Sequence, residues 1–67
     1  MNIIEGLHNE MDRVRGIIIE YDSLPKNAGA FAAMMMRYTL KQAESAIAVG
    51  DTVTMIAILK ELQGYEL

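Results

Sequence analysis

The sequence predicts an all-α fold: a three-helix chain with an antiparallel helical hairpin, assembled into an oligomeric helical bundle. Apolar residues recur at spacings of three and four along most of the 67 residues, as they do in helices with one buried face. Three breaks, at Pro25, Gly50 and Gly64, divide that pattern. A hydrophobic fraction of 52% with six methionines suggests that further copies of the chain cover part of the surface. We expect one helical domain, 1–67, with helices at about 3–22, 30–49 and 52–63.

An uninterrupted amphipathic stripe predicts the first helix. Asn2 precedes the stripe and is an N-cap candidate. Charged side chains fill the opposite face, so this helix buries one side only. The apolar positions are Ile4, Leu7, Met11, Val14, Ile18 and Tyr21.

A loop separates the first two helices. Pro25 forces Leu24 out of helical geometry, and Gly29 loosens the approach to the next helix. Either Asn27 or Ser23 could cap the helix that follows.

The second helix is unusually apolar, because the run 30–36 contains no polar side chain. Seven consecutive apolar positions point in every direction around a helix, so a single neighbouring helix cannot cover them. Two apolar stripes imply two partners. We therefore expect an oligomer interface formed by Phe31, Met34, Met35 and Met36.

The third helix follows a stop and a start signal. Gly50 suits the left-handed position after a helix, and Asp51 can cap the next one. The sequence leaves open whether this helix folds back on the first two or packs on a neighbouring copy. It also leaves open whether the junction bends sharply or lets the two helices run nearly in line.

Composition excludes several classes of protein. Six basic and nine acidic residues are interspersed, giving a net charge of −3, which argues against a nucleic-acid partner. No apolar run reaches the roughly 18 residues of a membrane span, and the N-terminus lacks the features of a signal peptide, so we expect a cytoplasmic protein.

The chain has no cysteine and one histidine, so neither a disulfide nor a usual zinc site can stabilise so short a fold. Oligomerisation remains as the source of added stability, and we expect a dimer or a higher even order. We expect no metal and no cofactor.

One group of residues suggests an anion-binding site. The loop before the second helix brings free backbone N–H groups and a lysine to a helix N-terminus, where anions bind. Two further cations follow at i,i+4 spacing, and two tyrosines could stack on a ring. The other interpretation is an ordinary turn. The candidate ligand-binding residues are Tyr21, Lys26, Asn27, Gly29, Arg37, Tyr38 and Lys41.

Catalytic signals are sparse. His8 stands one helical turn before Asp12, a pair that could orient an imidazole, but no serine or cysteine nucleophile lies nearby in sequence. We therefore expect no catalytic residues and a protein that is not an enzyme. An enzyme built on His8 would need a subunit interface to supply its cavity.

The chain combines, in register, a regular N-terminal helix ending near Tyr21, the segments 24–31, 33–37 and 43–51, and a methionine at Met55. In this order of features it resembles small uncharacterised helical proteins encoded in tailed phages and prophages. Members commonly have glycine where Ala32 stands and valine where Thr52 stands. No activity comes with the family, but a phage context implies a counter-defence role in the bacterial host cell.

Two functions follow as expectations. The first is a homo-oligomer that sequesters a nucleotide-type or other anionic small-molecule signal. The alternative is a protein–protein inhibitor or adaptor that binds a host defence protein through a helical face.

Overall fold

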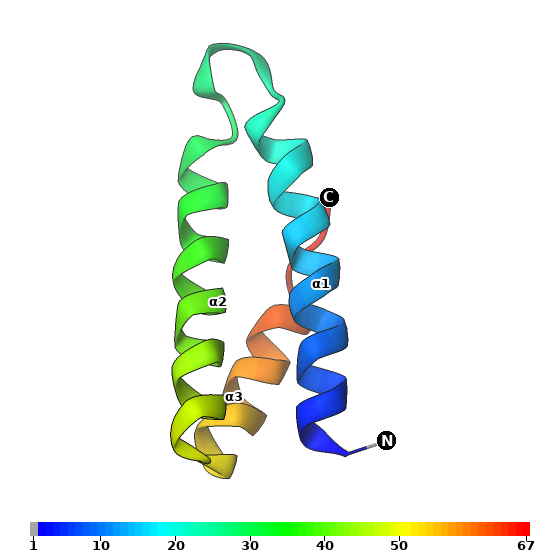
Figure 1. Ribbon diagram of the computed structural model, residues 1–67. Helices are drawn as coiled ribbons and strands as arrows, with labels where there is room; N and C mark the ends of the chain where they lie inside the picture. The colour runs from blue at the N-terminus through cyan, green and yellow to red at the C-terminus, as the bar shows by residue number, and fades with distance from the viewer. Residues whose placement is uncertain (1) are drawn as a thin grey trace.

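A computed structural model describes residues 2–67, and within them the all-α class is confirmed, since no strand is present. The elements are α1 (Ile3–Asp22), a short 3-10 turn (Pro25–Asn27), α2 (Ala30–Val49) and α3 (Thr52–Gln63). These boundaries agree with the predicted helix ranges; Met1, the first residue of the predicted domain, lies outside the described residues. Figure 1 shows α1 and α2 side by side, joined at one end by the loop, with α3 against both at the other end.

The start of α1, the end of α2 and the start of α3 have the caps that the sequence predicts. The Asn2 side-chain oxygen accepts a hydrogen bond from the Glu5 backbone N–H at 2.8 Å, and Asp51 accepts one from Thr54 at 3.1 Å. Both bonds satisfy donors that have no partner within the helix. Gly50 ends α2 in the left-handed region, with φ of 71°, as expected.

The loop between α1 and α2 differs from the prediction. Neither Ser23 nor Asn27 caps α2: the N-cap is Gly29, which offers no side-chain acceptor. The Ser23 hydroxyl instead donates back to the Ile19 carbonyl at 2.8 Å. Asn27 stands two residues before the cap position, in the left-handed region with φ of 59°, because the chain makes a 3-10 turn before it enters α2.

Close backbone packing makes Gly29 necessary. A Cβ at this position would lie 2.8 Å from the carbonyl carbon of Tyr21 and closer still to its oxygen. No side chain fits between these two backbones. Gly29 therefore sets how tightly the start of α2 approaches the end of α1.

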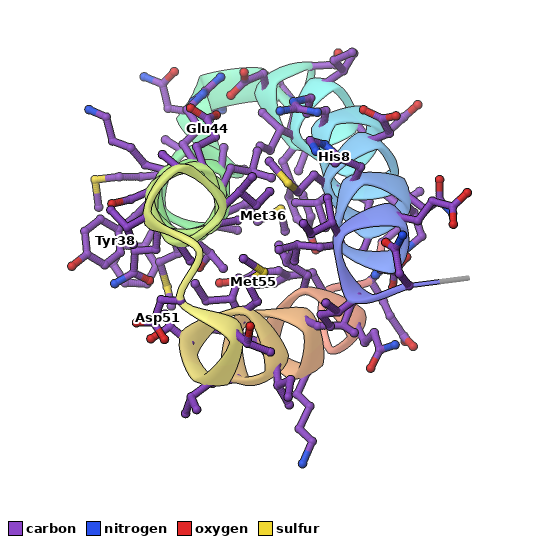
Figure 2. The ribbon with its side chains drawn as sticks, turned by 60° about the horizontal axis from the view of Figure 1, so that its bottom comes forward. His8, Met36, Tyr38, Glu44, Asp51 and Met55 are labelled. Carbon is purple, nitrogen blue, oxygen red and sulfur yellow. The ribbon has the colours of Figure 1, made fainter. Side chains whose placement is uncertain are left out.

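A single core fills the space between the three helices. Figure 2 shows Met36 and Met55 pointing into this space from α2 and α3. Since α3 contacts both other helices, it folds back within its own chain, and the Gly50-Asp51 junction bends sharply. The fully buried core side chains are Leu7, Met11, Val14, Ala33, Ala43 and Leu62. Among residues 2–67, none of the helices combines the length and apolar character that a bilayer crossing requires.

Candidate functional site

Three of the predicted anion-binding residues lie together on α2. Arg37, Tyr38 and Lys41 line one shallow hollow of about 460 Å³, bordered also by Leu40 and Glu44. Arg37 and Lys41 are one helical turn apart, so their side chains project from the same face. The structure therefore brings these three residues together, as their spacing in the sequence predicts, and their binding role stays a prediction.

Acidic neighbours balance the cations around this hollow. Arg37 forms an ion pair with Asp22 of α1, and Glu44 lies 3.9 Å from a guanidinium nitrogen of Arg15. Lys41 has no ion pair within the described part of the chain. All these side chains are exposed, so each pair is screened by water and has a small energy. An arriving anion would meet Lys41 directly and would compete with Asp22 for Arg37.

The other predicted ligand residues lie elsewhere. Lys26 and Asn27 precede α2, and Arg37 follows the first residue of α2 by seven positions, about 10 Å along the helix axis. Only an elongated ligand could reach both. Tyr21 is half-buried, and its hydroxyl donates to the carbonyl of Glu66 at 3.2 Å, so it belongs to a different contact from Tyr38.

The core leaves an apolar surface on α2 uncovered. Phe31, Met34, Met35 and Tyr38 are 69%, 58%, 45% and 65% exposed and fall on one side of the helix at helical spacing. We call these four residues the α2 apolar face. Met36, predicted to share this interface, is only 2% exposed, because its direction from the helix points it into the core. It is not available to a second copy.

A second hollow, of about 420 Å³, opens between α2, α3 and the C-terminal tail, residues 64–67. Sequence reasoning missed Thr39, which lies on α2, and also Glu61 and Tyr65, which only the folded α3 and tail bring to α2. No sequence spacing could have shown this, as those segments are more than twenty residues apart. The lining residues are Met34, Met35, Tyr38, Thr39, Glu61 and Tyr65.

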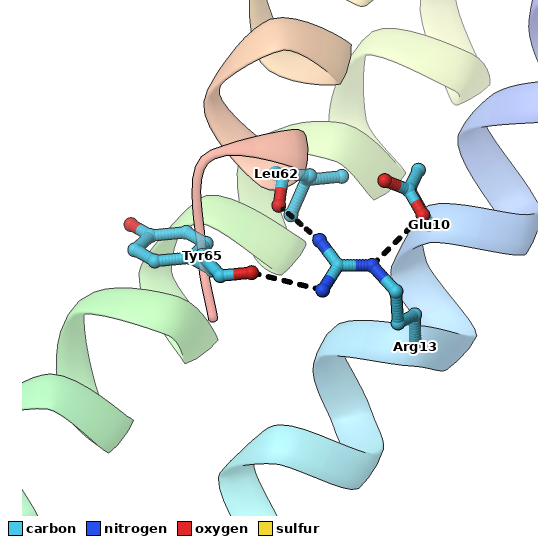
Figure 3. A network of polar contacts seen from close by, with 4 residues as sticks. All are labelled: Glu10, Arg13, Leu62 and Tyr65. Carbon is cyan, nitrogen blue, oxygen red and sulfur yellow. Dashed lines mark hydrogen bonds and ion pairs between the residues drawn. The ribbon is translucent and has the colours of Figure 1, made fainter. Parts of the chain in front are cut away.

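The tail that forms one wall of this second hollow is held by Arg13 of α1 (Figure 3). The guanidinium donates at 2.8 Å to the carbonyl of Leu62 and at 2.8 Å to that of Tyr65, while its Nε donates to Glu10 at 3.0 Å. The Tyr65 hydroxyl lies 3.0 Å from that of Thr39. The tail is thus tied to both α1 and α2.

Neither a triad nor a metal cluster forms around the single histidine. His8 is exposed on α1, and Asp12, its predicted partner, instead accepts a hydrogen bond from Arg15 at 2.8 Å. Within residues 2–67, no three His, Cys, Asp or Glu side chains gather closely enough to hold a metal ion.

Tyr38 is the wall that the two hollows share. The first hollow is lined by the cations Arg37 and Lys41 together with Glu44, whereas Glu61 is the charged residue that lines the second. Figure 2 shows Tyr38 pointing away from the core.

Comparisons of the chain with known family models, curated proteins and solved structures find no match.

Proposed function

We propose that this chain is a small phage-type accessory binding protein that acts in the cytoplasm of a bacterial host cell as a counter-defence factor. In this proposal a homo-oligomer sequesters a nucleotide-type or other anionic small-molecule signal. The observation that carries it is the cluster of Arg37, Tyr38 and Lys41 around one hollow of about 460 Å³. A planar guanidinium, an ammonium and an aromatic ring are the groups that bind a phosphate beside a base.

The ion pair to Asp22 supports a binding role for Arg37. A carboxylate across the helix contact holds the guanidinium at the edge of the hollow before a ligand arrives. Side chains already ordered in this way lose less conformational entropy on binding. A phosphate can then take over the hydrogen bond that Asp22 accepts from Arg37.

Self-association is proposed through the α2 apolar face, presented by an antiparallel hairpin of α1 and α2. By typical side-chain areas, the four exposed residues offer on the order of 400 Å² of apolar surface. That is large for a chain of this size, yet a standard interface needs about 800 Å² per partner. We therefore propose that other exposed apolar residues, Val53 and Ile56 of α3, also take part in contacts between copies.

Titration calorimetry with a panel of mononucleotides and cyclic dinucleotides tests the anion site. Arg37→Ala and Lys41→Ala should each weaken binding by about ten-fold, the loss of one charge-assisted contact. Lys60→Ala is the matched control, because Lys60 is an exposed cation on α3 that does not line the hollow. Equal affinities across all three variants would contradict the proposed site.

A second candidate function, an inhibitor or adaptor that binds a host protein through a helical face, is favoured by the same α2 apolar face. In that case Phe31→Ser would release a copurifying host protein, and nucleotides would have no effect on that complex. A homo-oligomer would instead dissociate in the same variant and leave no heterologous partner. Analytical ultracentrifugation of the two preparations separates these functions.

A further inference from the structure

We propose that the hollow between α2, α3 and the tail, here called the Glu61 pocket, is a docking site for an arginine side chain carried on an apolar segment of another protein. The pocket has a volume of about 420 Å³. This goes beyond the proposed function, since the Glu61 pocket lies on the opposite side of Tyr38 from Arg37 and Lys41 and takes a cation.

The walls of the Glu61 pocket are apolar and already formed. Met34 and Met35 contribute flexible, polarisable side chains that adapt to a guest of irregular shape. Tyr65 is fixed from two directions, by Thr39 at its hydroxyl and by Arg13 at its backbone carbonyl. An incoming side chain therefore meets an ordered aromatic wall rather than a mobile tail.

Glu61 is the only charged side chain that lines the pocket. No Lys, Arg or His of the described residues lies within ion-pairing distance of it. Three lining residues carry hydroxyls, and those of Thr39 and Tyr65 already contact each other. All three hydroxyls are neutral, so the Glu61 carboxylate is the acceptor that carries the charge complementary to a cation. A cationic guest fits this arrangement and an anionic one does not.

The chemistry of the walls selects arginine over lysine. A guanidinium is weakly hydrated, stacks on aromatic faces such as those of Tyr38 and Tyr65, and can form two hydrogen bonds to one carboxylate. An ammonium would lose more hydration on entering a hollow lined by thioethers and rings. Apolar residues flanking the arginine can cover the rest of the α2 apolar face, because Met34, Met35 and Tyr38 belong to both surfaces.

The guest comes from another protein rather than from a second copy. The three arginines of this chain are already engaged: Arg13 with the tail, Arg15 with Asp12 and Arg37 with Asp22. A second copy could donate one only by breaking an existing contact. An arginine of another protein could enter the pocket without breaking any of these three contacts.

Methyl NMR with two synthetic peptides tests this proposal. The probes are acetyl-Leu-Arg-Leu-Leu-amide and its citrulline counterpart, which keeps the shape of the arginine but lacks its charge. The arginine peptide should shift the methyl resonances of Met34 and Met35 and bind about five-fold more tightly than the citrulline peptide, the value of a partly screened ion pair. Glu61→Gln should abolish this preference, whereas Glu66→Gln, an exposed carboxylate outside the pocket, should retain it.

Three outcomes would overturn the proposal: equal affinity for both peptides, an unchanged preference in Glu61→Gln, or no shift of either methyl. Self-association through the α2 apolar face would also shift these methyls, but without dependence on Glu61. Concentration-dependent shifts that occur without peptide and are lost in Glu61→Gln would therefore also overturn the proposal, by assigning the pocket to a second copy. Glu61 is exposed, so its substitution leaves the core intact, which far-ultraviolet circular dichroism checks. The test is independent of nucleotide binding, which depends on Arg37 and Lys41.

Discussion

The guanidinium of Arg13, on the first helix, donates a hydrogen bond to the backbone carbonyl of Tyr65, 52 residues later in the chain. A second bond from the same group reaches the carbonyl of Leu62 in the last turn of α3, where carbonyls have no partner within the helix. One side chain therefore caps α3 and fastens the tail. Because the tail walls the Glu61 pocket, Arg13 positions a site that it does not touch.

Replacing Arg13 by methionine should destabilise the protein by roughly 1–2 kcal/mol, since two carbonyls lose a charged donor while the apolar stem is kept. Urea unfolding followed by circular dichroism measures this change. Arg15→Met is the control, because Arg15 pairs only with exposed carboxylates, and it should change stability by less than about 0.5 kcal/mol. A smaller loss for Arg13→Met than for Arg15→Met would show that the tail contact is not stabilising.

Gly29→Ala should destabilise the fold by roughly 2 kcal/mol or more, because the new Cβ would collide with the backbone of Tyr21 and push α1 and α2 apart. Gly16→Ala is the matched control. Gly16 lies within α1 with open space around it, so alanine there should stabilise the protein by up to about 1 kcal/mol. Thermal unfolding distinguishes the two: if both variants melt at the same temperature, the close approach at Gly29 is unimportant.

Met36 and Met34 are two residues apart but should behave oppositely. Met36→Ala leaves a cavity in the core and should cost about 2–5 kcal/mol of unfolding free energy. Met34→Ala should change the unfolding of a dilute sample by under about 0.5 kcal/mol and instead weaken self-association. Sedimentation equilibrium measures the self-association of both variants, and urea titration measures their free energies of unfolding. A dissociated Met36→Ala with normal stability would contradict the placement of Met36 in the core.

The cap at Asp51 should make stability depend on acid pH. Hydrogen bonds from the hydroxyl and then the backbone N–H of Thr54 hold the pKa of Asp51 below its ordinary value of 3.8. The folded state therefore favours the ionised carboxylate, so its contribution is complete above pH 3.8 and is lost as the pH falls through the lowered pKa. The stability difference between the native protein and Asp51→Ala should be constant near neutrality and shrink below pH 3.8. A difference that persists unchanged to the lowest pH would exclude the carboxylate as its source.

The sequence was most informative about local structure. Asn2, Gly50 and Asp51 act within one turn of their own positions, so their roles follow from residue type alone. The fold-back of α3 could not be predicted, because Met55 and Leu62 would suit a neighbouring copy as well as the core of their own chain. The interface prediction failed at Met36 for a related reason: a run of apolar residues does not show which member faces inward.

The candidate sites also differ in how far the sequence could predict them. That Arg37 and Lys41 lie together was predictable, since i,i+4 residues of one helix are neighbours in space. The Glu61 pocket was not, because Tyr65 reaches α2 through long-range contacts, such as those with Arg13 and Thr39. Spacing within a helix is visible in a sequence, and contacts across a tail are not.

Native mass spectrometry of the protein, mixed with a panel of nucleotides, tests sequestration by a homo-oligomer in one experiment, because it reports subunit number and bound mass together. We expect a defined oligomer of even order that takes up a small anionic mass, and an Arg37→Ala oligomer of the same order that takes up less. A ligand-free monomer at micromolar concentration would contradict it.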